Sequence, residues 1–209
     1  MGDYPGFLEM KHRRCVVIGG GAVAERKVEG LVAAGANVTV ISPGITDGLK
    51  ELLRQGAIRH VAREYQAGDR AGYDLFFVAT DSSEINRVVF SEARSLRIWV
   101  NSADDPDHCD FILPAVIRRG DLTVAVSTGG ASPAVARAIR EELDEYFTAH
   151  YAWFVQIAGE VRRELREKSV SPAGSAWNRA LQGDFRRLIK EGRLVQAKEL
   201  LLETLGAKS

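Results

Sequence analysis

A glycine turn between a strand and a helix constrains this chain more than any other feature of its sequence. Residues 15–18 read CVVI, an apolar and β-branched run typical of a buried strand, and the triplet Gly19–Gly21 follows directly before a helical stretch. With Gly19, Gly21 and Ala24, the turn fits the G-x-G-x-x-G/A pattern of a dinucleotide-binding βαβ unit. Gly19 permits a tight turn, Gly21 lets the backbone approach a pyrophosphate, and Ala24 keeps the helix close to its strand. The first N–H groups of the helix would then face the phosphates.

The rest of the first half alternates strand and helix patterns. Asp81, with Glu84 three residues later, is typical of a capping box that begins a helix. Alternation at these lengths predicts right-handed crossovers and a parallel sheet with helices on both faces. The predicted strands lie over residues 36–41, 58–62, 74–80 and 98–101, and the predicted helices between them over residues 46–55 and 81–95.

The pattern changes after the last of these strands. Apolar runs over residues 111–117 and 122–127 flank an Arg-Gly-Asp turn and predict an antiparallel hairpin. Ser132 as N-cap and Pro133 at the first helical position predict a long helix that ends near residue 147. From residue 150 onward the sequence is helical apart from short breaks. The second half is therefore expected to form a separate module.

Ligands of a parallel sheet bind at the carboxyl ends of its strands, so the predicted dinucleotide site lies there. Ser42 takes the place where an Asp or Glu usually holds the ribose hydroxyls of NAD. No Arg stands beside Ser42 to bind the 2′-phosphate of NADP, and we therefore predict NAD as the cofactor. The predicted cofactor-binding residues are Gly19, Gly21, Ala22, Val23, Ser42, Pro43, Gly44, Thr80, Asp81 and Asn101.

An acidic loop over residues 104–110 follows the last strand of the predicted sheet. Its carboxylate, imidazole and thiol groups are of metal-ligating types, yet they are packed too tightly in sequence for most to converge on one ion, and we predict no metal site. A solvated turn would explain most of the charges but not their position. Asp104 follows Asn101 at the carboxyl end of the strand, where a carboxylate can accept a proton as a hydride leaves a neighbouring carbon. On the residues alone, Asp105 remains the alternative.

Another polar segment, residues 127–133, reads STGGASP and precedes the long helix. Hydroxyl groups, flexible backbone and a helix N-terminus together form an anion site, which would suit substrate carboxylates. An ordinary cap and turn is the alternative for the same residues. The predicted substrate-binding residues are Ser127, Thr128, Gly129, Gly130, Ser132 and Arg137.

Composition and missing motifs exclude several classes of protein. The 28 Lys and Arg residues balance 28 Asp and Glu residues, so the charge gives no sign of nucleic-acid binding. No apolar run reads as a signal peptide or a membrane span, and we expect a cytoplasmic protein. Two distant cysteines indicate neither a disulfide framework nor a zinc site. The sequence also lacks the Tyr/Lys pair of short-chain dehydrogenases, the G-x-S-x-G elbow, the P-loop and the H-E-x-x-H motif.

Three segments together resemble the siroheme synthase amino-terminal family of precorrin-2 dehydrogenases, some of which are also sirohydrochlorin ferrochelatases. The segments are GGGAVAERK (19–27), VATDSSEIN (78–86) and VNSADDPDHCDFILPAVIRRGDLTVAVSTGGASPAVARAIRE (100–141). The resemblance implies an α/β fold that works as a homodimer. Its parts would be a Rossmann-type NAD-binding domain over residues 1–113, a small α+β dimerisation region over 114–147 and a C-terminal helical domain over 148–209.

The same resemblance implies a reaction and a catalytic residue. Asp104 corresponds to the family's catalytic aspartate, which is implicated in NAD-dependent oxidation of precorrin-2 to sirohydrochlorin and, in bifunctional members, in Fe(II) insertion. The segment 127–130 corresponds to one that is phosphorylated in some members. The usual V-N-V-V-D run is V-N-S-A-D here, a change in size beside the catalytic carboxylate. The methyltransferase domain fused in some members is absent from the sequence, so precorrin-2 is expected from a separate enzyme.

Two other functions remain open at this point. In the first, the chain is a non-catalytic, dimeric regulatory module that senses NAD, which would need the glycine turn but neither Asp104 nor the STGGASP segment. In the second, it is a chelatase only, which would insert iron into sirohydrochlorin without NAD.

Overall fold

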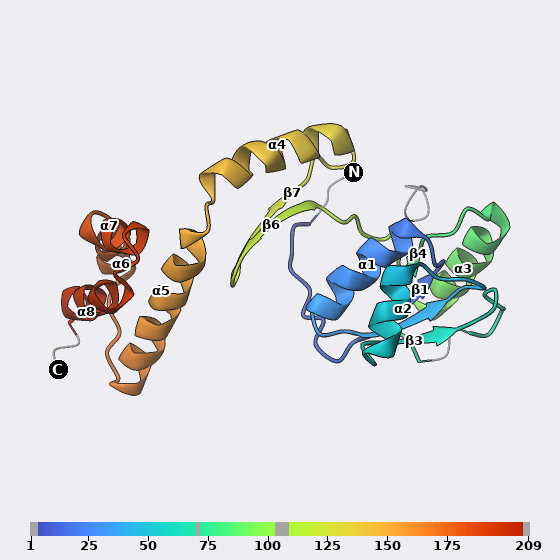
Figure 1. The fold of residues 1–209 in the computed structure, drawn as a ribbon, viewed down its shortest axis with the longest axis horizontal. Helices are drawn as coiled ribbons and strands as arrows, with labels where there is room; N and C mark the ends of the chain where they lie inside the picture. The colour runs from blue at the N-terminus through green and yellow to red at the C-terminus, as the bar shows by residue number, and fades with distance from the viewer. Residues whose placement is uncertain (1–3, 70–71, 103–108, 207–209) are drawn as a thin grey trace. The chain divides into compact units, whose positions relative to one another are not determined.

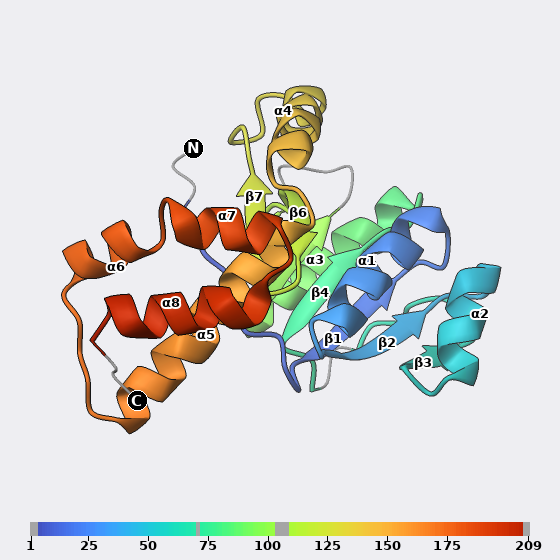
Figure 2. The ribbon, with the colours of Figure 1, turned by 60° about the vertical axis from the view of Figure 1, so that its left-hand side comes forward.

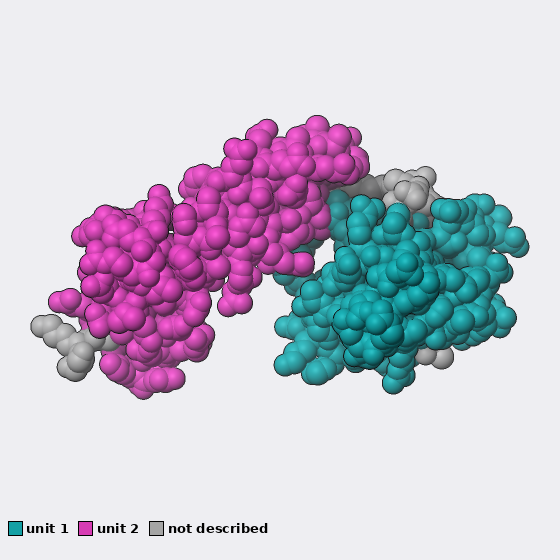
Figure 3. Space-filling view, viewed as in Figure 1, with its two compact units in different colours: residues 1–113 teal, residues 114–209 magenta. Residues whose placement is uncertain are grey.

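The computed structural model describes residues 4–69, 72–102 and 109–206. The chain divides into two compact units, Met1–Leu113 and Pro114–Ser209, coloured separately in Figure 3. Each unit has its own architecture. Asp104, the predicted catalytic residue, lies outside the described residues, as does Asp105.

The first unit is a parallel sheet of five strands in the order β3-β2-β1-β4-β5 (Figure 1). β1 lies between β2 and β4, and Val16 is level with Thr39 on one side and with Phe76 on the other. The predicted α/β class is therefore confirmed. The strands are β1 (Arg14–Ile18), β2 (Asn37–Ile41), β3 (Ile58–Val61), β4 (Leu75–Val78) and β5 (Trp99–Ser102), and the helices are α1 (Ala22–Ala33), α2 (Asp47–Arg54) and α3 (Ser83–Leu96).

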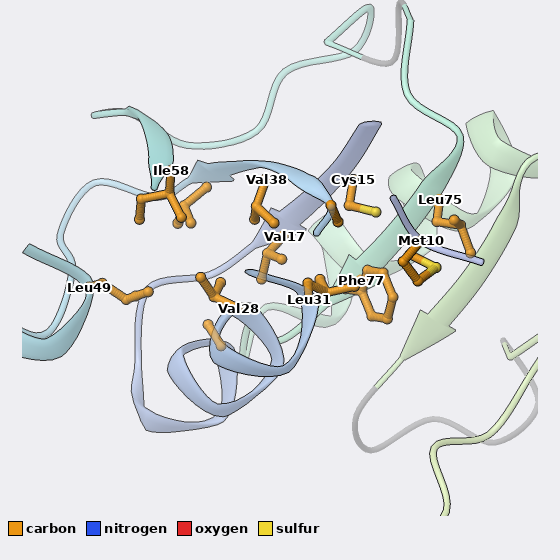
Figure 4. Packing of buried hydrophobic residues seen from close by; sticks show 13 residues of the cluster. Met10, Cys15, Val17, Val28, Leu31, Val38, Leu49, Ile58, Leu75 and Phe77 are labelled. Carbon is orange, nitrogen blue, oxygen red and sulfur yellow. The ribbon is translucent and has the colours of Figure 1, made fainter. Parts of the chain in front are cut away.

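Helices cover both faces of this sheet because successive side chains of a strand point to opposite faces. Cys15 and Val17 of β1 pack with Val28 of α1 and Leu49 of α2 in one core cluster (Figure 4). Alternate residues of the same strands pack on α3, in a second cluster that contains Val16, Ile18, Phe76, Val78, Val89 and Ala93. All four residues of β4 are buried, as a central strand requires.

The two cysteines have structural roles, Cys15 in the core of the first unit and Cys109 beside β5. Burial, and to a lesser extent the Asp74 carboxylate, raises the pKa of the Cys15 thiol to about 12, so this side chain stays protonated in the core.

The start of α3 corrects a sequence prediction. Its N-cap is Ser82, whose hydroxyl accepts a hydrogen bond from the backbone N–H of Ile85, and Asp81 lies one residue before the cap.

The second unit begins with the predicted antiparallel hairpin, in which Ala115 pairs with Val126 and Arg119 with Leu122. Ser132 caps α4 and Pro133 occupies its first turn, as predicted. Helices α5, α7 and α8 lie side by side (Figure 2). They pack around a core that includes Val161, Phe185 and Leu201. The elements are β6 (Ala115–Arg119), β7 (Leu122–Val126), α4 (Pro133–Tyr146), α5 (His150–Glu167), α6 (Gly174–Ala180), α7 (Asp184–Lys190) and α8 (Leu194–Thr204).

The predicted boundary between a dimerisation region and a helical domain at residues 147 and 148 stays a prediction. Among the helices that the structure describes, none has both the length and the apolar character needed to cross a membrane.

Candidate functional site

The turn after β1 requires glycine at its first position. Gly19 has a φ of +116°, a backbone conformation that residues other than glycine rarely adopt. A Cβ built there would lie 2.0 Å from the carbonyl oxygen of Ala79. The Gly19 N–H donates to the carbonyl of Ile41 at 3.0 Å. Through this one residue the carboxyl ends of β1, β2 and β4 come into direct contact.

The second glycine of the triplet is equally constrained, and the motif did not reveal it. A Cβ at Gly20 would lie 2.0 Å from the carbonyl oxygen of Gly44 and 2.8 Å from Oγ of Ser42. The Gly20 carbonyl accepts a hydrogen bond from the N–H of Thr46 at 3.1 Å. Gly20 therefore packs against the loop after β2 and binds it through a hydrogen bond. The G-x-G-x-x-G/A pattern allows any residue at this position, so the motif does not predict the contact.

The third glycine faces open space. Gly21 is the N-cap of α1 with a φ of −84°, and no side chain of the described residues caps the helix. A Cβ at Gly21 would meet no atom within 4 Å. Ala24, by contrast, is fully buried against the sheet, as the motif predicts. An uncapped helix N-terminus with room in front of it fits the pyrophosphate of a dinucleotide, and the structure brings the predicted residues Ala22 and Val23 to this end of the helix.

The loop after β2 holds its own shape through Ser42. This residue is 8% exposed, and its hydroxyl donates to the carbonyl of Gly44 at 2.7 Å. Nε2 of His60, a residue that the sequence analysis did not single out, lies 2.9 Å from the carbonyl oxygen of Ser42. Pro43 and Gly44 are exposed beside it. The loop is thus shaped to lie over Gly20, and its predicted contact with the ribose stays a prediction.

The end of β4 is a second hydrogen-bonded turn. Oγ1 of Thr80 accepts a hydrogen bond from the N–H of Ser82 at 3.2 Å. The backbone carbonyl of Thr80 accepts one from the side-chain amide of Asn86 at 3.3 Å. Asp81 is exposed. Thr80 and Asp81 therefore lie at the same sheet edge as the glycine turn, as predicted for a parallel sheet.

The end of β5 carries a polar contact with α1. Asn101 is 4% exposed, and its Oδ1 accepts a hydrogen bond from Nζ of Lys27 at 2.5 Å. Its side-chain nitrogen donates to the carbonyl of Phe111 at 2.9 Å. Lys27 was missed at the sequence level, although it closes the GGGAVAERK segment, because a helical lysine normally indicates a solvated face. Here its ammonium group lies at the carboxyl edge of the sheet.

The two described residues of the acidic loop pair with the edge strand β5. The N–H of Val100 donates to the Asp110 carboxylate and its carbonyl accepts from the Asp110 N–H, both at 2.8 Å. Sγ of Cys109 accepts from the N–H of Ser102 at 3.0 Å and donates to its carbonyl at 3.1 Å. These contacts give Cys109 and Asp110 a structural role at the edge of the sheet. They also hold together the two ends of the segment that contains Asp104.

In the second unit, the STGGASP hydroxyls bond mainly within their own turn. Oγ1 of Thr128 donates to the carbonyl of Ser132 and accepts from its N–H, each at 3.1 Å. The Ser132 hydroxyl caps α4, and Oγ of Ser127 accepts from the N–H of Gly129 at 3.2 Å. Gly130 has a φ of +81°, and Arg137 is exposed one turn into the helix. The cap-and-turn alternative accounts for these hydroxyls, and the predicted anion site stays a prediction.

The glycine triplet offers a matched pair of substitutions. Gly19→Ala introduces a strained φ and an overlap with a backbone carbonyl, so we expect it to lower the free energy of unfolding by about 2–4 kcal/mol. Gly21→Ala meets no atom, and we expect thermal unfolding close to that of the wild type with a Kd for NAD raised at least about tenfold. Circular dichroism and calorimetric titration measure the two effects. Unchanged NAD affinity in Gly21→Ala would remove this turn from the cofactor site.

The Asn101 side chain is expected to stabilise the sheet edge through both of its hydrogen bonds. Asn101→Ala should lower the free energy of unfolding by about 2–4 kcal/mol, since one lost bond involves a charged donor and both bonds are partly buried. Asn37→Ala is the control, because the exposed Asn37 amide makes a 3.2 Å bond to the carbonyl of His12 and should cost about 0.5 kcal/mol. Equal losses in denaturant titrations would contradict a special role for Asn101.

Comparisons with known proteins agree with a dinucleotide-binding domain in the first unit. Residues 7–115, more than half of the chain, match the family described as putative NAD(P)-binding, and residues 119–146 match the one described as sirohaem biosynthesis protein central. A solved structure entitled "SirC, precorrin-2 dehydrogenase" superposes with a TM-score of 0.74 at 26% identity, over 97% of this chain and 98% of that one.

Curated relatives extend beyond the region that they share with this chain. The siroheme synthase of Methylococcus capsulatus is 38% identical over 208 residues, which is 98% of this chain and 44% of that protein. The siroheme synthase of Nitrosomonas europaea is 37% identical over 207 residues, 97% of this chain and 44% of the relative. The chain thus spans less than half the length of these relatives. It belongs to the NAD(P)-binding family and is the counterpart of the NAD-binding and central domains of siroheme synthase.

Proposed function

We propose that this chain is an NAD-dependent precorrin-2 dehydrogenase of siroheme biosynthesis. The observation that carries the proposal is its likeness to SirC, a precorrin-2 dehydrogenase, along nearly the whole of both chains. The geometry of the glycine turn also supports the proposal, because an uncapped helix N-terminus at the carboxyl edge of a parallel sheet suits the pyrophosphate of a dinucleotide.

The residues at the sheet edge divide the binding of NAD among them. The turn from Gly19 to Val23 would hold the pyrophosphate and the Ser42–Gly44 loop the adenosine ribose, while Asn101 lies at the edge where the nicotinamide is expected. When bound, NAD supplies a hydride acceptor for the oxidation of precorrin-2. The balance is precorrin-2 and NAD⁺ giving sirohydrochlorin, NADH and a proton, so the site needs a group that accepts a proton.

Asp104 is the proposed proton acceptor. It follows Ser102 by two residues, in the segment whose ends are joined by the contacts between Ser102 and Cys109. Lys27 and Asn101 act on the same edge as positioning residues. Their hydrogen bond, together with that from Asn101 to the Phe111 carbonyl, anchors the end of β5 to α1 and to the chain beyond the acidic loop.

The assembly and the second reaction are also proposals. A homodimer follows from the family resemblance, and a cytoplasmic location is proposed because the buried Cys15 thiol suits a reducing compartment. The name siroheme synthase, carried by the relatives, favours Fe(II) insertion into sirohydrochlorin as a second activity. Fe(II) would be a substrate of that step, with Asp104 again the proposed acceptor of macrocycle protons.

Replacing the proposed proton acceptor tests its role. We expect Asp104→Asn to slow NADH formation from precorrin-2 at least about 100-fold, because an amide cannot accept the proton, while the Kd for NAD stays within twofold. Asp105→Asn is the matched control and should keep most of the rate. Stopped-flow absorbance of NADH provides the measurement. A full rate in Asp104→Asn, or a loss confined to Asp105→Asn, would contradict the assignment.

Cofactor choice gives a second test. Ser42 lies where an acidic residue would normally select NAD, and the nearby Arg63 guanidinium is held by the Asp69 carboxylate at 2.6 Å through both of its terminal nitrogens. With this guanidinium engaged, we expect initial rates at least about tenfold higher with NAD than with NADP at equal concentration, because a 2′-phosphate normally needs an Arg partner. Equal rates with the two cofactors would overturn the preference.

A further inference from the structure

A pocket of about 310 Å³ opens within the second unit, between the end of α4, the start of α5 and α7. None of the residues assigned to the dinucleotide or to the STGGASP segment lines it. Its lining combines aromatic rings, cationic groups and hydroxyls, and this combination indicates a ligand with a flat apolar body and negative charge.

Aromatic rings form one wall of the pocket. The ring of Tyr151 lies 6.0 Å from that of Tyr146 and 6.0 Å from that of Phe154, measured between ring centres. Tyr146 is 63% exposed although it lies in this row. The row therefore brings aromatic rings and phenol groups into the lining of the pocket, and aromatic rings are the groups on which a flat conjugated molecule stacks.

Two cations of α7 face the same space. Arg186 is fixed from three sides: its Nε donates to the carbonyl of Leu181 at 3.2 Å, its Nη1 to the Tyr151 hydroxyl at 3.5 Å, and its guanidinium lies 4.9 Å from the centre of the Phe154 ring. Lys190, one turn later, also lines the pocket. The hydrogen bond with Tyr146 is the largest cause that lowers the pKa of Tyr151, and the hydrogen bond with Arg186 and the charges of Arg186 and Lys190 lower this pKa further.

A buried hydroxyl in the lining has no partner. Oγ1 of Thr148 is shielded from solvent and makes no hydrogen bond with any residue that the structure describes. Buried polar atoms are normally hydrogen-bonded, so Thr148 is a polar group of the pocket wall whose hydrogen bonding is incomplete. His150 adds a further polar group to the lining, and the Glu145 carboxylate is the lining group that opposes an anion.

We propose that this pocket binds one edge of a carboxylate-bearing tetrapyrrole, stacking a pyrrole ring on the aromatic row and pairing its carboxylates with Arg186 and Lys190. The inference rests on the proposed function for the identity of the macrocycle. A volume of about 310 Å³ is at the lower end for small-molecule sites, so the pocket holds part of the ligand and leaves the rest outside. It would give the second unit its own contact with substrate or product, separate from the sheet edge.

Calorimetric titration of the full chain with uroporphyrin I, a stable macrocycle with eight carboxylates, tests this site. We expect the Kd for uroporphyrin to rise at least about tenfold in Arg186→Gln, because hydrogen bonds hold the Arg186 guanidinium in place. We expect a smaller, several-fold rise in Lys190→Gln, because the Lys190 side chain has none of these hydrogen bonds. Arg187→Gln is the matched control. Arg187 lies next in the sequence but pairs with Asp184 at 3.0 Å and with Glu191 at 3.2 Å outside the pocket, so its Kd should stay within twofold.

The outcomes separate this inference from the proposed function. Uroporphyrin binding that is equal in the wild type, Arg186→Gln and Lys190→Gln overturns the pocket, as does an equal loss in Arg187→Gln. Displacement of uroporphyrin by an equal concentration of benzene-1,3,5-tricarboxylate would assign the pocket to small aromatic acids and overturn the macrocycle. NADH formation from precorrin-2, measured on the same wild-type protein, reports on the dehydrogenase alone.

Discussion

The close approach of backbone at Gly19 and Gly20 is the contact on which the rest of the site depends. With no Cβ at either position, the turn after β1 packs directly on the backbone at Ala79 and Gly44, and three strand ends share one edge. The same approach directs α1 so that its uncapped N-terminus lies at that edge and Lys27 reaches Asn101. The position of the α1 N-terminus and the contact between Lys27 and Asn101 thus follow from the absence of a Cβ at Gly19 and Gly20.

Much of this arrangement could be predicted from the sequence because it depends on periodicity and on single-residue geometry. The alternation of strands and helices, the antiparallel hairpin and the Ser132 cap all have local signals. Contacts between distant segments have none. Gly20 and Lys27 each owe their importance to residues more than 20 positions away, and the cap at Ser82 was misjudged by one residue because Asp81 is an equally good capping type.

Some polar groups of this chain form hydrogen bonds within the fold, and others have no hydrogen-bond partner among the described residues. The carboxylate of Asp110, the thiol of Cys109 and the Thr128 hydroxyl bond to neighbouring backbone, and the fold accounts for them. The N–H groups at the start of α1 and the Thr148 hydroxyl lack such partners among the described residues. The first of these groups lies at the proposed site for a dinucleotide phosphate, and the second lies in the wall of the pocket proposed for the acidic edge of a macrocycle.

Oxidation of precorrin-2 at the expense of NAD is the central claim, and its stoichiometry tests it most directly. Purified protein, NAD and authentic precorrin-2 are mixed without iron, and NADH and sirohydrochlorin are followed by absorbance in the same sample. A dehydrogenase forms one NADH for each sirohydrochlorin, because one hydride leaves each precorrin-2. Binding of NAD without any NADH formed would contradict the account and favour a module that senses the dinucleotide.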